Sequence, residues 1–385
     1  MKNIVRAVGV FIKKADMLLL MLCVITTIFG IVAISSATNY SGSTRYVSVQ
    51  TAALLLGIAF YILLTLVDVD IIAERRELLM IFCVLFIGSL HFFGVEGETG
   101  NKSWLELPFL PLNVQPAEIC KIFFIIILAK TMSISQNKLS SPITISKMAG
   151  LTLLLFVLIV YVSADTGVAL IYLFIFLVMA FVGGVHVFWF LGGLGAAVVA
   201  TPILWPMLRV DQKNRILMLF DPSIDPEGLG VRWDTNRSLQ AIQNGGITGQ
   251  GLYNGTMIKS HSIAAQHTDF IFSAIAEEMG MIACIFVMLL LTAIVVRCIY
   301  VGIKSHNYMN RIICIGIAAM LLFQIIINVG MCLGVLPVIG LTLPFVSYGG
   351  SSVITMFLAM GIVSGIHMRP APDANARYIR PRQTL

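Results

Sequence analysis

The sequence predicts an all-α polytopic membrane protein, organised as a single membrane domain over residues 1–385. Hydrophobic residues make up 58% of the chain and charged residues only 11%, and the mean hydropathy is +0.94. This composition excludes a soluble domain of the same length, because such domains carry about 25% charged residues. Two further observations support the class: a series of apolar runs, and an alternation of positive charge between them.

Ten apolar runs are candidate membrane helices, since about 20 apolar residues span the hydrocarbon core. The third, fourth and fifth runs are short, and the eighth is long enough to tilt or to project beyond the membrane. The runs are Met17–Ser36, Val49–Val67, Leu78–Gly94, Ala117–Met132, Met148–Val162, Thr166–Gly184, His186–Leu208, Asp269–Tyr300, Ile312–Val335 and Ser351–His367.

Positive charges predict the orientation of these helices. The charges fall on alternate segments of the chain, so both termini are expected in the cytoplasm. Residues 209–268, between the seventh and eighth helices, then form one large extracellular loop. The net charge of +6 therefore reflects topology and does not indicate a nucleic-acid partner. The basic segments are the N-terminus, the turn with Arg75 and Arg76, the loop from Lys138 to Lys147, Arg297–Arg311 and the tail 369–385.

Cysteine and histidine spacing gives no sign of a metal centre. The seven cysteines lie within apolar runs without CxxC spacing, which is typical of small core residues. The six histidines show no ligand spacing, and neither an HExxH run nor a Ser/His/Asp constellation occurs. The sequence therefore indicates no cofactor.

A single aspartate, Asp269, ends the long polar loop and begins the eighth apolar run, within HTDFIFSAIAEEMG (residues 267–280). A carboxylate at the mouth of a transmembrane bundle is costly to desolvate, which makes it a functional candidate. The alternative is a helix N-cap, a role for which Thr268 competes. Spacing alone does not decide between the two.

The helix that follows Asp269 carries a stripe of small residues. Ser273 and Ala276 share the face of Asp269, which leaves room for a groove from the aspartate into the membrane. Glu277 lies roughly 12 Å deeper at ~1.5 Å per residue. Glu278 is expected to point the opposite way, so at most one of the two glutamates faces that groove.

Two charges sit at the start of the fourth predicted helix. Glu118 and Lys121 are three residues apart, so they share a helix face and can pair. An unpaired charge there would cost about 2.5–3.5 kcal/mol on insertion scales, which favours pairing inside the bundle. A purely structural ion pair and a pair that lines a cavity both remain open.

Three further polar residues interrupt apolar segments. Asp165 precedes Thr166 at a tight outer turn between the fifth and sixth helices, where helix capping is the favoured interpretation. Gln324 and Asn328 lie four apart on the ninth helix and are expected to form interhelical hydrogen bonds.

The outer loop is rich in turn-forming residues. It contains LFDPSIDPEGLG (219–230) and NGGITGQGLYNGT (244–256). Closely spaced glycines let a backbone approach a ligand, and they also make compact turns. A phosphate loop is excluded because no GxxxxGK[ST] run occurs.

Taken together, several strings resemble the SEDS family of cell-wall proteins, which includes RodA, FtsW and SpoVE. The resemblance covers nearly the whole chain in the expected order, and the strings NGT (254–256) and NVGM (328–331) favour the RodA branch. The matching residues are Trp104, QPAEICK (115–121), Asp165-Thr166-Gly167, RILMLFDP (215–222), GGITGQGL (245–252), HTDFIFSAIAEEMG and LPVIGLTLPFVSYGGSS (336–352).

The resemblance implies a protein of the bacterial cytoplasmic membrane that polymerises glycan strands from lipid II at the outer face. Such proteins act with a class B penicillin-binding transpeptidase in elongation or division complexes. Asp269 would correspond to the essential aspartate. The remaining implied substrate-binding residues are Trp104, the functionally sensitive positions Glu118, Lys121 and Asp165, and the cationic positions Arg45 and Arg215 near the outer cavity.

The chain also departs from the family pattern. The family usually has Arg at the position of Ser103, Pro-Glu at Ala264-Ala265, and Pro at Thr342. Two of these changes touch the outer cavity, so a specialised or weakened relative is one interpretation. Lys102 is a candidate to supply the missing positive charge.

The leading hypothesis is an inverting peptidoglycan glycosyltransferase in which Asp269 is the general base on the acceptor hydroxyl, a role worth ~10²–10⁴ in rate. Arg45, Arg215 and Lys121 are candidates to stabilise the lipid pyrophosphate leaving group. A divalent cation on the pyrophosphate is left open. The alternatives are a lipid II flippase and a noncatalytic scaffold for the transpeptidase. The small-residue run GGLGAA (192–197) is a candidate partner surface, with packing inside the bundle as its alternative.

Overall fold

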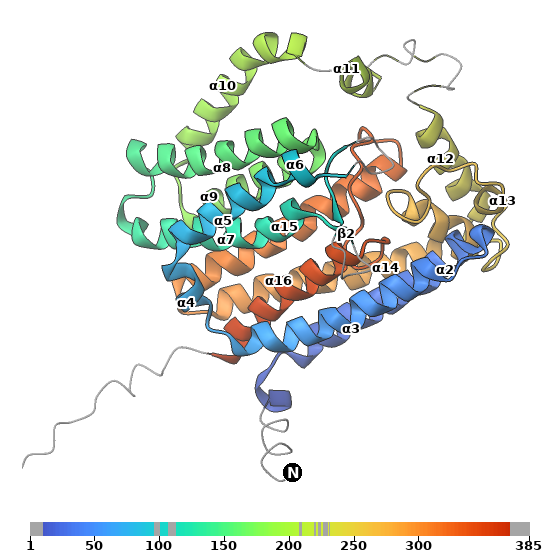
Figure 1. The fold of residues 1–385 in the computed structure, drawn as a ribbon, viewed down its shortest axis with the longest axis horizontal. Coiled ribbons are helices and arrows are strands. Elements are labelled where there is room, and N and C mark those ends of the chain that lie inside the picture. The colour runs from blue at the N-terminus through green and yellow to red at the C-terminus, as the bar shows by residue number, and fades with distance from the viewer. Residues whose placement is uncertain are drawn as a thin grey trace, which may run out of the picture.

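The computed structural model describes residues 11–95, 101–106, 113–207, 210–218, 221, 225, 230 and 232–369, and it is mostly helical (Figure 1). Each predicted apolar run coincides with a long helix, or, for the third run, with two helices in succession. The predicted tail after Arg369 and part of the string 215–222 lie outside the described residues. The long helices are α2 (Met17–Ala37), α3 (Arg45–Leu66), α5 (Arg76–Gly88) with α6 (Leu90–Phe93), α7 (Pro116–Ile134), α8 (Pro142–Ser163), α9 (Thr166–Gly183), α10 (Val187–Leu204), α14 (Ile271–Lys304), α15 (Tyr308–Cys332) and α16 (Gly350–Met368).

Shorter elements connect these helices. The outer loop contributes α11, α12 and α13, and Figure 1 shows α12 and α13 together at one end of the bundle. The shorter elements are α4 (Val69–Glu74), α11 (Val210–Leu217), α12 (Trp233–Gly245), α13 (Thr256–Lys259), the strands β1 (Leu105–Glu106) and β2 (Asn113–Val114), and the 3₁₀ turns Asn39–Ser41, Gln136–Lys138 and Trp205–Met207.

Among the described residues, eight helices are long and apolar enough to cross a membrane. Helix α7 is not one of them, and it carries Glu118, Lys121 and Lys130 within 19 residues. Helix α10 is a shorter apolar helix. The all-α polytopic class is therefore confirmed, whereas ten crossings and the side on which each loop lies remain predictions.

Helix boundaries follow local sequence signals. Ser141 and Asn307 cap α8 and α15, because their side-chain oxygens accept from the amides of Thr144 (3.3 Å) and Met309 (3.0 Å). Pro116 occupies the first turn of α7, where its missing N–H costs no hydrogen bond.

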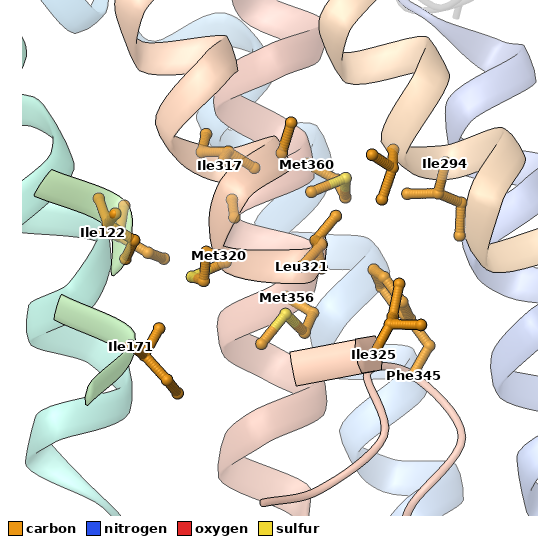
Figure 2. Packing of buried hydrophobic residues seen from close by; sticks show 14 of the residues in the cluster. Ile122, Ile171, Ile294, Ile317, Met320, Leu321, Ile325, Phe345, Met356 and Met360 are labelled. Atoms are coloured by element: carbon orange, nitrogen blue, oxygen red, sulfur yellow. The ribbon is translucent and has the colours of Figure 1, made fainter. Parts of the chain in front are cut away.

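Helices α15 and α16 form the centre of the bundle. Of their most apolar stretches, 78% is buried in each, compared with 17–44% in the other six candidate spans. Figure 2 shows Leu321 and Ile325 of α15 gathered with Met356 and Met360 of α16. These two helices are therefore shielded from lipid by the rest of the bundle.

Helix α14 is not one straight helix. Gly280 breaks it with φ +79° and ψ −178°, a conformation open to glycine. Four backbone hydrogen bonds of 2.9–3.3 Å join residues 277–282 to the glycine-rich segment 246–251. A side chain at Gly280 would clash with the backbone of that segment. The eighth predicted run is therefore two helical pieces, and the expectation of one tilted or projecting helix is wrong.

Helix α10 stands at the edge of the bundle (Figure 1). A Cβ added at Gly192, Gly193 or Gly195 would meet no atom within 4 Å. Packing of this small-residue run inside the bundle is therefore wrong, and its use as a partner surface remains a prediction.

Candidate active site at the outer end of the bundle

The loop between α15 and α16, residues 336–349, contacts most of the elements that carry predicted site residues. It forms no helix or strand, so its backbone groups must find other partners. Side chains from α3, α11 and α15 supply several of these partners. The bonds are Arg215 Nη1 to the Val338 carbonyl (2.9 Å), Asn328 Nδ2 to the Leu341 carbonyl (2.6 Å), Gln50 Nε2 to the Ser347 carbonyl (3.0 Å) and the Gly349 amide to Gln50 Oε1 (3.1 Å).

Asp269 lies in a turn just before α14 and is partly exposed. The N-cap position of α14 belongs to Phe270, which has no side-chain cap. The N-cap alternative for Asp269 is therefore wrong, and Thr268 is not the cap either. The sequence placed the helix start two residues too early because the apolar run begins at Phe270.

The backbone around Asp269 is held at three consecutive carbonyls. The amide of Tyr348 donates to the carbonyl of His267 (2.9 Å). The hydroxyl of Ser347 donates to the carbonyl of Thr268 (2.6 Å), and Asn328 Nδ2 donates to the carbonyl of Asp269 (2.8 Å). Three donors from the 336–349 loop and α15 thus fix the aspartate, and we call these three bonds the carbonyl row.

Gly340 brings the same loop close to the carboxylate. Its φ is +76°, and a Cβ built on it would lie 3.4 Å from Asp269 Oδ2. The loop backbone can approach the carboxylate this closely because residue 340 is a glycine.

An aromatic cluster lies beside the carbonyl row. The rings of Tyr46, His267 and Tyr348 contact one another, with centroids 4.8–5.5 Å apart. Arg45 precedes Tyr46 at the start of α3 and is exposed. The predicted cation at position 45 therefore lies at the outer end of α3, next in sequence to a residue that touches the Asp269 region. The sequence stage missed Tyr46, which had no pattern of its own.

Arg215 reaches the site from α11. Its guanidinium donates to the Val338 carbonyl, two residues before Gly340, and its side chain is otherwise exposed. Partial burial raises the pKa of Asp234 on α12, and the nearby Arg215 opposes that rise. Arg215 thus connects α11 and α12 electrostatically to the loop beside Asp269.

Glu118 and Lys121 form the predicted ion pair. Lys121 Nζ lies 2.6 Å from Glu118 Oε1, and both side chains are buried. The second carboxylate oxygen, Oε2, is buried without a hydrogen-bond partner in the described part of the chain. The pairing is confirmed, and the choice between a structural and a cavity-lining role remains open.

Asp165 caps α9 and also contacts the α7 region. Its Oδ1 accepts from the Val168 amide (3.0 Å) and its Oδ2 from Gln115 Nε2 (3.3 Å). Burial raises the pKa of Asp165 to about 6; the Val168 hydrogen bond opposes this, Glu118 adds to it and Lys121 opposes it. The capping interpretation is confirmed, and the aspartate also lies within electrostatic reach of the buried pair.

Trp104 lies in the segment that leads toward α7. Its carbonyl accepts from the Val95 amide (2.8 Å), and β1 and β2 then pair antiparallel just before Gln115. Ser103 is buried, whereas Lys102 is exposed. At this departure from the family pattern the exposed cation is thus one residue earlier, in line with the prediction for Lys102.

The two glutamates of α14 hold the outer loop. Glu277 accepts from the amides of Met257 (2.8 Å) and Ile258 (3.1 Å). Glu278 accepts from the Ser36 hydroxyl (2.8 Å) and the Gly255 amide (3.4 Å). Both carboxylates therefore reach residues 255–258, and the expectation that they face different surroundings is wrong.

The glycine-rich segment packs on α14, and no groove runs along the small-residue stripe. A side chain at Gly245 would clash with the Ala276 backbone. The hydroxyls of Ser238 and Ser273 lie 2.5 Å apart. Helix α12 thus covers the stripe, so the predicted groove is wrong and these glycines serve close packing.

The remaining departures surround the site. Ala265 has φ +46°, and its carbonyl accepts from the amides of Thr268 (3.0 Å) and Phe270 (3.3 Å). Ala264 next to it is exposed, and Thr342 lies in the 336–349 loop. Position 265 therefore shapes the turn that presents Asp269.

The predicted residues fall on two flanks of the stretch 338–341. Asp269 approaches Gly340 on one flank, whereas Gly167, two residues after Asp165, packs against Ile339 and Leu341. The structure thus brings Asp269 and the Asp165–Glu118–Lys121 group to one loop without direct contact between them in the described bonds. Gln324, expected to bond another helix, has a buried Oε1 without a partner among the described residues.

Comparison with known proteins agrees with this arrangement. A family model described as cell cycle protein, covering FtsW, RodA and SpoVE, matches residues 15–371. The chain belongs to this family. The peptidoglycan glycosyltransferase MrdB of Escherichia coli K12 is 32% identical over 294 residues, 75% of this chain and 76% of the relative. The probable peptidoglycan glycosyltransferase FtsW of Geobacter metallireducens is 30% identical over 367 residues, 93% and 96% of the two chains.

Solved structures of this FtsW/RodA/SpoVE family superpose on the bundle. A chain of a peptidoglycan synthase complex, in which polymerization and crosslinking are coordinated, gives a TM-score of 0.78 at 28% identity and covers 93% of this chain and 99% of its own. RodA of Thermus thermophilus gives 0.69 at 26% identity, covering 93% and 98%. The membrane-spanning fold is thus that of the family.

Glu118 and Lys121 should behave as a coupled pair in this family member. Removing one partner leaves a buried unpaired charge, which costs about 3–5 kcal/mol, while removing both does not. Each of Glu118→Ala and Lys121→Ala should therefore lower the apparent thermal unfolding midpoint in detergent more than the double variant does. Lys130→Ala, a partly exposed lysine on the same helix, is the control. A double variant less stable than either single variant would show that the two charges act independently.

Asp165 should make stability depend on pH. Its folded pKa of about 6 exceeds the ordinary 3.8, so the folded state holds the proton over this window and gains stability as the pH falls from 7 toward 4. Asp165→Asn keeps the capping oxygen without titrating. The variant should therefore gain on the wild type at pH 7.5, and this advantage should shrink at pH 5, as measured by unfolding midpoints. An advantage that is the same at both pH values would contradict the raised pKa.

Proposed function

We propose that this protein is a peptidoglycan glycosyltransferase that joins lipid II units into glycan strands at the outer face of the cytoplasmic membrane. The observation that carries the proposal is the fixed position of Asp269 beside Gly340, at the end of the bundle that also presents Arg45 and Arg215. The activity named for the relatives MrdB and FtsW supports it. Cell elongation, shape or division is the process that such strands would serve.

In this reaction Asp269 acts as general base. Its carboxylate takes the proton from the acceptor sugar hydroxyl, and the oxygen attacks the anomeric carbon of the lipid-linked sugar. The bond from that carbon to the pyrophosphate oxygen breaks with inversion, and the lipid pyrophosphate leaves. A base held in place in this way contributes ~10²–10⁴ in rate.

Cations at the outer end would stabilise the leaving group. The negative charge on the pyrophosphate grows as its bond to the sugar breaks, and fixed cations stabilise such charge. Arg45 and Arg215 are exposed there. Lys121 is already neutralised by Glu118 at 2.6 Å, so the two arginines are the stronger candidates, with Trp104 and the Glu118–Lys121–Asp165 group as further substrate contacts. Among the described residues no cluster of three metal-ligating side chains occurs, and a divalent cation carried by the pyrophosphate stays a separate proposal.

Asp269→Asn should abolish polymerisation while leaving expression and folding intact. The amide keeps the shape of the side chain but cannot accept the hydroxyl proton. Because the carbonyl row is made by the backbone at Asp269, it survives the substitution. The measurement is polymer formed from labelled lipid II by purified protein, alongside the unfolding midpoint. Normal polymer from a well-folded Asp269→Asn protein would overturn the assignment of the base.

The same assay separates the alternative functions. In liposomes, a flippase would move labelled lipid II across the bilayer without polymer. A noncatalytic scaffold would do neither, which is also the expected result if Ser103, Ala264, Ala265 and Thr342 have weakened catalysis beyond detection.

We infer further that the chain works with a class B penicillin-binding transpeptidase, as part of an elongation or division complex. The structural relative from a complex that coordinates polymerization with crosslinking supports this. Exposed apolar faces on α10, α14 and α15 are candidate surfaces, because membrane helices associate through close packing.

Single cysteines on these faces should form adducts with the transpeptidase in native membranes. Leu194→Cys, Leu289→Cys and Leu322→Cys introduce exposed thiols on α10, α14 and α15, whereas the seven native cysteines are buried. Leu153→Cys on α8 is the matched exposed control. At least one of the three positions should crosslink more than the control. Equal or no crosslinking at all four positions would count against the partnership.

A further inference from the structure

We propose that Asn328 is a positioning residue for the reaction: its amide sets the distance between Asp269 and the 336–349 loop. The proposal rests on the proposed role of Asp269 as base. Asn328 touches no reacting atom in this arrangement. It acts through the backbone of the residue that does.

The side chain of Asn328 joins two backbones that lie far apart in sequence. Its Nδ2 donates to the Asp269 carbonyl (2.8 Å) and to the Leu341 carbonyl (2.6 Å). An amide nitrogen carries two N–H groups, so each carbonyl takes one of them. Gly340, which approaches Asp269 Oδ2, is adjacent to Leu341. One amide group therefore fixes both sides of the contact at the carboxylate.

The surroundings of Asn328 make this bridge rigid. The residue is fully buried in the central helix α15, where rotamer changes are restricted by packing. One turn later, Cys332 Sγ lies 3.7 Å from the same Asp269 carbonyl, and a thiol is a weak donor. The neighbouring carbonyls of Thr268 and His267 are held by Ser347 and Tyr348, so Asn328 completes the row at the catalytic residue itself.

A stability role alone explains Asn328 poorly. Its Oδ1 is buried without a hydrogen-bond partner among the described residues, and a buried unsatisfied oxygen costs stability. Polar residues kept at such a cost are expected at functional sites. Gln324, one turn earlier on α15, is also buried with an unpartnered oxygen, but it has no described bond to Asp269.

A general base works only when it is held against the hydroxyl it deprotonates. A displacement of about 1 Å can cost ~10²-fold in rate. Without Asn328, the Asp269 backbone and the loop at Leu341 could separate, while Arg45 and Arg215 would still bind substrate. The loss should therefore fall on kcat, with KM for lipid II nearly unchanged.

The test compares Asn328→Leu and the near-isosteric Asn328→Asp with Gln324→Leu. Leucine removes the donor, and aspartate replaces it with an oxygen facing two carbonyls. We expect kcat for polymerisation to fall at least about tenfold in both Asn328 variants, with KM within about twofold and the unfolding midpoint near that of Gln324→Leu. Hydrogen exchange in the segment 265–272 should accelerate in the Asn328 variants and not in Gln324→Leu.

Either readout can overturn the proposal. Unchanged exchange in 265–272 for Asn328→Leu relative to Gln324→Leu would show that Asn328 does not position Asp269, whatever the activity. Equal losses of kcat in Asn328→Leu and Gln324→Leu would reduce the residue to a structural one, and a rise in KM at constant kcat would assign it to substrate affinity. A wild-type protein that forms no polymer would instead refute the proposed function, while the exchange data would still decide whether Asn328 holds Asp269.

Discussion

The row of three carbonyls at residues 267–269 is the constraint on which the outer end of this protein depends. Irregular backbone at the end of a membrane bundle must satisfy its polar groups internally. Here Tyr348, Ser347 and Asn328 supply one donor to each carbonyl. A carboxylate that would otherwise sit on a loose turn is thereby attached to the two most buried helices of the bundle, α15 and α16.

The 336–349 loop extends this constraint to the other functional elements. Gln50 of α3 bonds it at Ser347 and Gly349, and Arg215 of α11 bonds it at Val338. Gly167 packs on its middle from the opposite flank. Elements from the first, middle and last thirds of the chain therefore meet at one segment that has no secondary structure of its own, and the candidate site forms only when all of them are in place.

Buried charges in α14 have a different task. Glu277 and Glu278 lie where charge is costly in a membrane helix, yet their oxygens accept from amides and hydroxyls near residues 255–258. Together with the break at Gly280, they attach the outer loop to the helix that Asp269 precedes. The loop is thus part of the bundle's hydrogen-bonded structure, which suits a surface that must hold a polar substrate above the bilayer.

The sequence by itself determined the class of protein, the positions of the long helices, the Glu118–Lys121 pair and the candidacy of Asp269. Each follows from local quantities: apolar length against bilayer thickness, a three-residue spacing on a helix, and the cost of a charge near lipid. Only the tertiary structure decided that α12 fills the small-residue stripe, that α14 breaks at Gly280, and that Asn328 bonds Asp269 and Leu341 in place of another helix. These outcomes depend on which segments distant in the chain come to lie together, and a pattern of residue types within one helix carries no information on the neighbour that will cover it.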